Sequence, residues 1–216
     1  MIIVLDGVAG SGKSTTAKKI AHDLNFFYLD TGALYRAITY YLLNLKIDAN
    51  SKKINNALEK CLIECSYEDS IFKVYINNFD VTEMLRTKKV NNNVSSYSKN
   101  KVIREKLIDI QRSFSDRNLV ADGRDLGAVV FPTADYKFFL TADINVRAKR
   151  IFESKGFDLK EISDLKEIRD NLEVRDFIDS TRKNSPLVKS DQAILIDTSD
   201  LSIREQCDKI YKVIKK

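Results

Sequence analysis

Short apolar runs alternate with amphipathic segments along the 216 residues of this chain. Runs of β-branched, leucine and aromatic residues are typical of buried strands, and we expect strands at 2–5, 26–29, 119–122, 136–141 and 193–197. Apolar side chains that recur every three or four residues, or high helix propensity in charged stretches, predict helices, and we expect helices at 15–25, 33–45, 51–64, 87–98, 99–115, 144–154, 158–182 and 202–214. Strands that alternate with helices predict parallel βαβ units, and hence an α/β fold whose sheet is covered on both faces.

The pattern changes near Ser66. Residues 71–76 alternate between apolar and polar, an Asn-Asn turn signal follows, and residues 79–81 return to an extended pattern. These features predict a small antiparallel β-structure inserted into an otherwise helical stretch. The chain has only two prolines and no internal repeat, so we expect a single domain over 1–216.

The glycine-rich stretch after the first predicted strand matches the pattern G-x-x-x-x-G-K-[ST] from Gly7 to Ser14. Its glycines allow positive φ angles and a close approach of the main chain to a ligand. Successive amides and the start of the next helix then point N–H groups at an anion. In this motif Lys13 meets the β- and γ-phosphates, and the Ser14 hydroxyl ligates Mg²⁺. A glycine-rich turn without a ligand is the alternative, but the order strand, loop, helix favours a nucleotide phosphate site in a P-loop NTPase-type parallel sheet.

The composition is ordinary for a folded soluble protein, with 44% hydrophobic and 31% charged residues. No apolar run approaches the ~20 residues of a membrane span. Met1 leads directly into the first predicted strand, so we expect no signal peptide and a cytoplasmic location. The three cysteines, Cys61, Cys65 and Cys207, lack a metal-type pattern, and we expect reduced structural thiols. The single histidine, His22, has no evident partner for nucleophilic chemistry.

The chain carries 36 lysines and arginines against 31 acidic residues, a formal net charge of +5. No stretch interleaves basic and aromatic residues in the way that favours stacking of single-stranded nucleic acid. We therefore expect a monomer that binds small polyanions through individually placed arginines, with no nucleic-acid and no membrane partner.

Phosphate loops occur in GTPases, motors, transporters and small-molecule kinases, and other segments must distinguish these classes. The chain lacks the N-K-x-D element with which GTPases read the base, and it is short for a motor or transporter. Its arginines lie in several separate predicted helices. Because the rigid guanidinium fork matches phosphate oxygens, this distribution favours phosphoryl transfer to a small phosphorylated acceptor. A switch protein that hydrolyses ATP slowly is the alternative.

The chain resembles bacterial cytidylate kinases in four segments that occur in the same order: DGVAGSGKST, YLDTGALYRA, VADGRDLGAVVFPTADYKFFLTA and EVRDFIDSTRKNSPL. The resemblance spans nearly the whole chain, and the second and third segments are far more specific than the phosphate loop. Val8 stands where the family usually has proline, without the loss of a ligand group. The inserted β-structure also resembles the family's acceptor-binding region. The resemblance implies a core over 1–35, 100–155 and 190–216, an acceptor-binding insertion over 36–99, and a helical lid over 156–189.

This resemblance implies transfer of the γ-phosphoryl group of MgATP to CMP or dCMP. Other acceptors within the phosphate-loop kinases are UMP, AMP or a shikimate-like molecule. The ATP phosphates would be bound by Gly7, Val8, Ala9, Gly10, Ser11, Gly12, Lys13, Ser14 and Thr15. Mg²⁺ would be held by the bound nucleotide together with Ser14. The catalytic residues would be Lys13, Arg124, Arg175 and Arg182.

Five further positions match residues that hold the acceptor in the family. Thr31 and Arg36 would meet its α-phosphate, with an ordinary exposed helix arginine as the alternative for Arg36. Ser95, Arg104 and Asp125 would read cytosine, since a hydroxyl, a guanidinium and a carboxylate complement its amino group and ring acceptors. A second serine follows Ser95 directly, which leaves the register of that position open.

Asp122 ends a predicted strand near the phosphate loop. A carboxylate there could hold the Mg²⁺ water shell or orient Arg124, and helix capping is the alternative. Arg147 and Arg150 lie on the helix after the 136–141 strand, and we place them at the nucleotide end of the site.

Three residues of the charged stretch match lid residues of the family: Arg175, Asp179 and Arg182. Their i, i+4, i+7 spacing puts them on one face of a helix. The arginines would join the donor and acceptor phosphates, and Asp179 would contact the acceptor ribose. A solvated helix with surface salt bridges is the alternative, and Phe177 and Ile178 are less polar than the family's usual residues.

Overall fold

Five parallel strands form the central sheet of the computed structural model, which describes residues 1–154 and 162–214. The strand order is β2-β6-β1-β7-β8, and each pair of neighbours is parallel. The strands are β1 (Ile2–Gly7), β2 (Phe27–Asp30), β6 (Leu119–Gly123), β7 (Tyr136–Thr141) and β8 (Ile194–Asp197). Each strand lies where an apolar run predicted one, so the predicted α/β class is confirmed.

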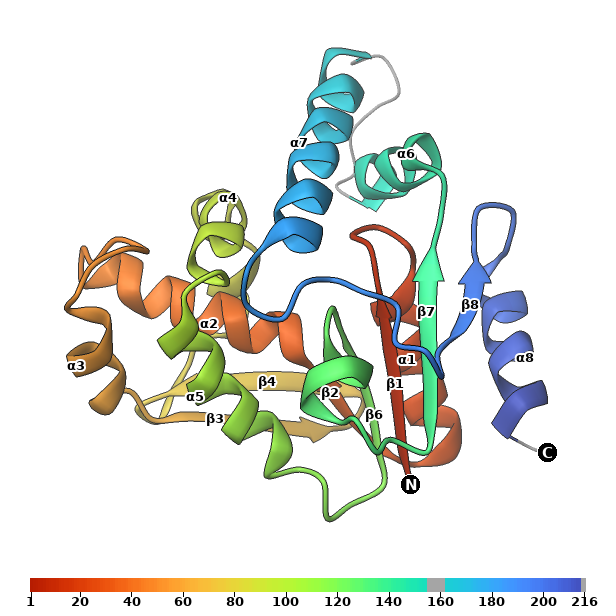
Figure 1. Ribbon diagram of the computed structural model, residues 1–216, viewed down its shortest axis with the longest axis horizontal. Helices are drawn as coiled ribbons and strands as arrows, with labels where there is room; N and C mark the ends of the chain where they lie inside the picture. Colours follow the sequence, from red (N-terminus) through yellow and green to blue (C-terminus); the bar gives the residue numbers. More distant parts are fainter. Residues whose placement is uncertain (155–161, 215–216) are drawn as a thin grey trace.

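Helices cover both faces of this sheet (Figure 1). They are α1 (Lys13–Leu24), α2 (Thr31–Asn44), α5 (Lys101–Arg112) and α8 (Ile203–Ile214), while α6 (Ile144–Ser154) and α7 (Ile162–Thr181) pack on each other. On one face, Leu5 of β1 packs with Ile20 of α1 and Ile210 of α8. On the other face, its neighbour Val4 packs with Leu107 of α5. Successive strand residues point to opposite faces, so burial of both faces explains why β1 is a continuous apolar run.

A second, antiparallel sheet of three strands lies within the predicted insertion. Its strands are β3 (Ile63–Glu68), β4 (Ile71–Ile76) and β5 (Phe79–Asp80). The same part of the chain contains the helices α3 (Ile54–Glu59) and α4 (Lys88–Tyr97) and the 3₁₀-helix η1 (Thr82–Arg86). The two hairpin turns, Asp69-Ser70 and Asn77-Asn78, each have two consecutive positive φ angles, as type I′ turns require. The predicted antiparallel insertion and its Asn-Asn turn are thus confirmed.

The predicted helix over 51–64 is wrong at its carboxyl end. α3 ends at Glu59, and Ile63 begins β3, where it pairs with Ile76. A short apolar run fits a helix or a strand equally well, and pairing with another segment decides between them. Both isoleucines are buried in one cluster, so tertiary packing favours the strand.

The residues after β6 form a π-helical turn, η2 (Leu126–Val130), that the apolar pattern did not predict. Arg112 of α5 donates to the carbonyl oxygens of Val129 at 2.8 Å and Val130 at 3.1 Å. Turns of this kind are rare and occur frequently at functional sites. This one directly follows Asp125, one of the predicted acceptor residues.

Helix α7 lies beyond the carboxyl edge of the sheet and beside α6 (Figure 1). Ile168 and Leu172 of α7 pack in one cluster with Phe152 of α6. Residues 156–161 of the predicted lid over 156–189 lie outside the part that the structure describes. The division of the chain into core, insertion and lid stays a prediction.

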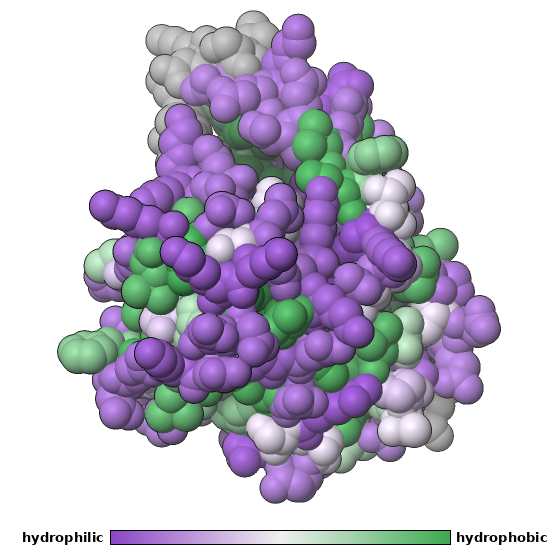
Figure 2. Space-filling model, turned by 60° about the vertical axis from the view of Figure 1, so that its left-hand side comes forward, coloured by the Kyte–Doolittle hydropathy of each residue, from purple (hydrophilic) through white to green (hydrophobic). Residues whose placement is uncertain are grey.

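The face of the molecule shown in Figure 2 is mostly hydrophilic, and its hydrophobic residues lie in small separate groups. Among the described helices, none is long and apolar enough to cross a membrane. Cys61, Cys65 and Cys207 are free thiols, and burial raises the pKa of each, to about 11, 12 and 11 respectively. Thiols with raised pKa values are poor nucleophiles, which agrees with a structural role.

Candidate active site

The phosphate loop connects the end of β1 to the start of α1 at the carboxyl edge of the sheet (Figure 1). Gly7, Gly10 and Gly12 have φ angles of 144°, 76° and 87°, as the motif predicts. A Cβ atom at Gly7 would lie 2.0 Å from the carbonyl oxygen of Leu140 on β7, so only glycine fits there. Beyond Gly12, the first amides of α1 have no partner within the helix, and such helix starts bind anions.

Lys13 begins α1, and its buried Nζ donates to the carbonyl oxygen of Val8 at 3.0 Å. The Ser11 hydroxyl donates to the same oxygen at 3.0 Å. Burial, followed by the charge of Arg124, lowers the pKa of Lys13 well below its usual range. A bound anion would favour the charged form of this lysine and oppose that shift.

Asp122 of β6 lies beside the phosphate loop and holds the residue predicted to ligate Mg²⁺. Its Oδ2 accepts from Ser14 Oγ at 2.5 Å, and its Oδ1 accepts from the Tyr28 hydroxyl at 2.7 Å. Its carbonyl oxygen accepts from Thr31 Oγ1 at 2.7 Å, which commits that hydroxyl proton to the main chain. Burial, followed by the charge of Asp30, raises the pKa of Asp122.

The Ser14 hydroxyl and the Asp122 carboxylate are hard oxygen donors. Such donors fit Mg²⁺, which keeps several waters and takes further ligands from substrate phosphates. The described residues contain no group of three or more His, Cys, Asp or Glu side chains that could hold a metal ion. The two oxygen donors fit a metal that takes its other ligands from water and from a bound nucleotide. The capping alternative for Asp122 is wrong, because its carboxylate accepts from two side-chain hydroxyls, and the N-cap residues of α2 and η2 are Asp30 and Asp125.

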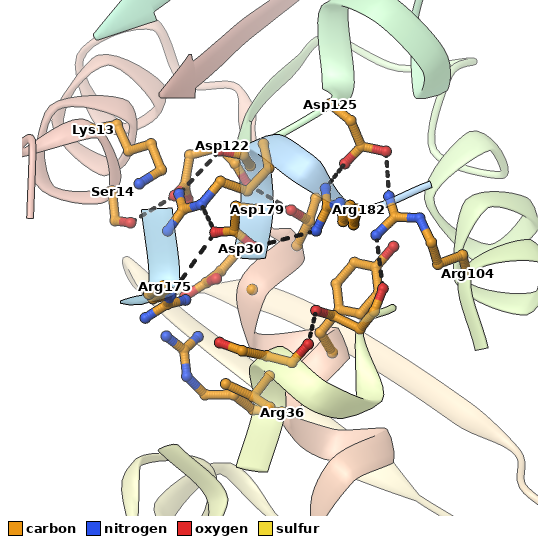
Figure 3. Close-up of a pocket in the computed structure, with 18 of the residues that line it drawn as sticks. Lys13, Ser14, Asp30, Arg36, Arg104, Asp122, Asp125, Arg175, Asp179 and Arg182 are labelled. Carbon is orange, nitrogen blue, oxygen red and sulfur yellow. Dashed lines mark hydrogen bonds and ion pairs between the residues drawn. The ribbon is translucent and has the colours of Figure 1, made fainter. Parts of the chain in front are cut away.

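A cavity, which we call the central cavity, opens beside the phosphate loop and reaches the insertion and α7 (Figure 3). It holds about 700 Å³ of empty space, including its open mouth. Its charged lining consists of Lys13, Asp30, Arg36, Arg86, Arg104, Asp122, Arg124, Asp125, Arg175, Asp179 and Arg182. Seven of these residues are cationic and four are acidic, so the lining favours an anionic ligand.

Arg104 and Asp125 form a buried ion pair on the opposite side of the central cavity from Lys13 (Figure 3). Arg104 is 2% exposed and donates to the carbonyl oxygen of Ser98 at 3.1 Å. Its guanidinium carbon lies 5.3 Å from the centre of the Tyr35 ring. Among the described residues, Arg104 Nε has no hydrogen-bond partner. A rigid pair of complementary charges beside an aromatic ring suits a planar polar ligand.

Ser95 of α4 lies on the wall of the central cavity, whereas Ser96 is exposed. The structure therefore places the predicted serine, and not its neighbour, at the site. Arg36 of α2 is half-buried, and its guanidinium points into the same cavity (Figure 3). Its Nε lies 3.4 Å from Asn91 Oδ1 of α4. Arg36 is thus not on the solvent side of its helix.

The lid residues Arg175, Asp179 and Arg182 face the central cavity together (Figure 3), as their spacing predicts. Asp179 accepts from Arg124 Nε at 3.0 Å and from Arg182 Nη1 at 3.3 Å, and its Oδ2 lies 3.9 Å from Arg175 Nε. Arg124 Nη1 also donates to the carbonyl oxygen of Gly7 at 2.8 Å. Arg124 is therefore oriented by Asp179 of α7 and by the Gly7 carbonyl oxygen. The alternative that Asp122 orients Arg124 is wrong.

The cations of the central cavity repel one another. Burial, followed by the charges of Arg124 and Arg36, lowers the pKa of Arg175 to about 9. Burial also lowers the pKa of Arg36, and Arg124 contributes to that shift. Among the described residues, Arg175 Nε has no hydrogen-bond partner. Phosphate oxygens between these arginines would supply the missing acceptors and favour their charged forms.

Two charged residues of the central cavity, Arg86 and Asp30, were not predicted to lie at the site. Arg86 of η1 lies with its Nη2 3.6 Å from Asp30 Oδ2 at the end of β2. Asp30 stands directly before a predicted helix, which signals a cap, but nothing near Arg86 in the sequence signals a site. The folding of the insertion brings it to the cavity.

Arg147 and Arg150 are absent from the lining described for the central cavity. Arg147 Nη1 donates to the carbonyl oxygen of Ala9 at 3.1 Å and to Asp176 Oδ2 at 2.7 Å. Arg150 Nη2 donates to the carbonyl oxygen of Thr198 at 2.6 Å. These arginines therefore brace the phosphate loop, α7 and the connection after β8 from outside the cavity.

A phosphate loop after the first strand of a parallel sheet, with a cation-lined cavity beside it, defines the class of P-loop kinases. A solved kinase structure has a similar fold. A gluconokinase from Sinorhizobium meliloti 1021 superimposes with a TM-score of 0.50 at 14% sequence identity, covering 96% of this chain and 87% of that chain.

The family follows from comparison of the whole sequence. A family model described as cytidylate kinase matches residues 3–216. The chain is 43% identical to a cytidylate kinase from Fusobacterium nucleatum, over 100% of this chain and 98% of that protein. It is 40% identical to a cytidylate kinase from Bacillus subtilis, over 99% of this chain and 96% of that protein. The chain belongs to the cytidylate kinase family, which confirms the resemblance carried by its four sequence segments.

Proposed function

We propose that this protein transfers the γ-phosphoryl group of MgATP to CMP or dCMP, giving ADP and CDP or dCDP. The observation that carries the proposal is the central cavity itself. It joins the lysine of a phosphate loop at one side to the buried Arg104–Asp125 pair at the other, with arginines between them. This is the layout that a phosphoryl donor and a planar, phosphorylated acceptor require.

On the donor side, the amides of the phosphate loop and Lys13 would bind the ATP phosphates. Mg²⁺ would be held by the phosphates and by the Ser14 hydroxyl, with Asp122 as the acceptor that positions this hydroxyl. The metal, when bound, neutralises charge on the β- and γ-phosphate oxygens.

On the acceptor side, Asp125 would accept from the exocyclic amino group of cytosine, and Arg104 and Ser95 would serve its ring acceptors. Uracil presents an oxygen where cytosine presents that amino group. Its binding would set this oxygen against a carboxylate and leave buried polar groups unpaired. Such a mismatch discriminates more strongly than the loss of a contact does.

The acceptor needs no general base, because its phosphate oxygen is already an anion. This oxygen attacks the γ-phosphorus in line, a new P–O bond forms, and the bond to the ADP β-phosphate oxygen breaks. The protein supplies positioning and charge. Lys13, Arg124, Arg175 and Arg182 would stabilise the oxygens of the migrating group, while Arg36 and Arg86 would hold the acceptor phosphate.

Every residue in this arrangement comes from one chain, so we propose that the monomer is the active unit. Closure of α7 over the bound nucleotides would exclude water, because an open site would hydrolyse ATP.

An acceptor panel at fixed MgATP tests the proposal through release of ADP with CMP, dCMP, UMP, AMP, shikimate or no acceptor. We expect CMP or dCMP to give a kcat/KM at least about a hundredfold above AMP and shikimate, since an unpaired buried polar group costs that much or more. Faster turnover with AMP or shikimate would refute the base-reading assignment. ADP release that no acceptor stimulates would instead indicate a switch protein.

A further inference from the structure

Asp6 is a buried carboxylate to which the mechanism above assigns no step. It lies on β1 directly before Gly7, is 5% exposed, and precedes the phosphate loop by one residue. Its side chain crosses to η2, the π-helical turn that begins after Asp125. A buried carboxylate at the junction of two functional loops needs a physical explanation.

Both oxygens of Asp6 accept from the main chain of η2. Oδ1 accepts from the Leu126 amide at 2.9 Å, and Oδ2 accepts from the Gly127 amide at 2.8 Å. These amides open the turn, where helical structures leave N–H groups without internal partners. The usual acceptor for such amides is the side chain of the residue at the N-cap position.

The N-cap residue of η2 is Asp125, and its side chain makes no capping hydrogen bond. Instead, its carboxylate pairs with Arg104 on one oxygen, and its other oxygen lies 3.7 Å from Arg182 Nη2. An aspartate at this position is free to face the central cavity only if another acceptor satisfies the amides that it would otherwise cap. Asp6 is that acceptor.

We propose that Asp6 is a positioning residue that caps η2 in place of Asp125 and thereby keeps the Asp125 carboxylate turned toward the base of the acceptor. The inference rests on the proposed function, since it assigns Asp125 to the base. It makes Asp6 a determinant of acceptor affinity and base selectivity without contact to either substrate.

The same segment also sets the residue before Asp125. The carbonyl oxygen of Gly7 accepts from Arg124 Nη1 at 2.8 Å. We call the side of the central cavity assigned to the acceptor the acceptor wall. Asp6 therefore holds the turn that follows Asp125, and Gly7 holds Arg124. Two consecutive residues of β1 thus position two consecutive residues of the acceptor wall. Burial raises the pKa of Asp6 to about 6, while its two amide bonds and Arg124 oppose this shift, so the carboxylate is ionised at pH 8.

The test is Asp6→Asn, assayed at pH 8 with ATP and CMP varied in turn. Asparagine keeps one acceptor oxygen and turns an amide donor toward the second main-chain N–H, so Asp125 would compete to cap the turn. We expect the KM for CMP to rise about tenfold, as the loss of one charged hydrogen bond predicts. The KM for ATP should stay within about twofold, and the preference for CMP over UMP should fall by about tenfold.

Asp143→Asn is the matched control. Asp143 also accepts from two backbone amides, those of Asn145 and Val146, at the start of a helix. It lies on the surface outside the central cavity, so we expect no change in either KM or in base preference. The more severe Asp6→Ala should extend the trend of Asp6→Asn, and thermal unfolding of each variant reports on folding separately.

An unchanged KM for CMP together with unchanged base preference in Asp6→Asn would overturn the inference. Equal increases in the KM values for CMP and ATP would overturn it too, because they indicate a purely structural role. The wild-type panel separates failure of the inference from failure of the proposed function. If wild type prefers another nucleoside monophosphate, the same comparison is made with that acceptor, and an unchanged KM for it in Asp6→Asn overturns the inference.

Discussion

The two sides of the central cavity are built in different ways. The donor side is a continuous stretch of main chain, residues 7–15, in which glycines, amides and one lysine form the site. The acceptor side consists of single side chains from α2, η1, α4, α5, the loop after β6, and α7. A continuous loop is specified by local conformation, whereas the acceptor wall exists only when distant segments pack correctly.

The two sides also differ in how their polar groups are satisfied. Lys13 and Ser14 each have a partner within the core, the Val8 carbonyl oxygen and Asp122. On the acceptor wall, Arg104 Nε and Arg182 Nη2 lack hydrogen-bond partners among the described residues. The side chains of Lys13 and Ser14 are therefore paired within the protein, while arginines of the acceptor wall keep N–H groups for a ligand.

Removal of the one cation of the phosphate loop should have the largest effect. We expect Lys13→Ala to lower kcat by at least about a thousandfold, since electrostatic stabilisation of the transferred group is lost. Thermal unfolding should change little, because the pKa of Lys13 shows that its burial disfavours the charged form. The exposed Lys19→Ala on the same helix is the control, with full activity expected. Substantial turnover by Lys13→Ala would place the donor elsewhere.

Loss of the base-reading carboxylate should come next. We expect Asp125→Asn to lower kcat/KM for CMP by about a hundredfold and to reduce or invert the preference over UMP. It should also destabilise the fold, because Arg104 stays buried without its partner. Steady-state kinetics and thermal unfolding measure the two effects, with the exposed Asp116→Asn as the control. Retained selectivity for CMP would show that other residues read the base.

Helix α7 allows a direct test that distinguishes a catalytic lid from a solvated helix with surface salt bridges. Arg175 faces the central cavity, whereas Arg169 on the same helix is exposed and pairs with Glu173. We expect Arg175→Ala to lower kcat about tenfold to a hundredfold with a smaller change in KM, the pattern for an interaction made mainly in the transition state. Arg169→Ala should behave like wild type. Equal kinetics of the two variants would contradict the assigned role of Arg175.

Ligand-induced stabilisation should be the smallest effect, and it tests whether the acceptor wall binds the phosphate of CMP. CMP at about tenfold its Kd should stabilise the fold by about 1.4 kcal/mol, measured as a shift in thermal midpoint. High salt should weaken this shift, because part of it comes from charge–charge attraction in a partly open site. Cytidine lacks the phosphate that meets Arg36, so a shift equal to that of CMP would exclude an anion-binding role for the acceptor wall.

The sequence predicted the donor side almost completely. The apolar run before Gly7 and the glycine spacing specify a strand and a loop through local physics alone. The parallel sheet follows from alternation of strands and helices, and each of its strands lies where it was expected. The helix predicted over 51–64 failed where it met Ile63, since pairing with β4 outweighs local propensity.

The acceptor side was predictable only in part. Resemblance to a family supplied Arg36, Arg104 and Asp125, and the structure brings all three to one cavity. Arg86 and Asp6 were missed, since nothing in their local sequence shows what lies across from them. The role of Asp6 depends on η2, a turn that the pattern of apolar residues does not predict. It also depends on a hydrogen bond between Asp6 and Leu126, which are 120 positions apart.

A crystal structure with CMP and MgADP bound tests the central claim most directly. We predict cytosine against Arg104 and Asp125, the CMP phosphate at Arg36 and Arg86, and the ADP β-phosphate at Lys13. CMP bound away from these residues, or ADP bound away from the phosphate loop, would contradict the account.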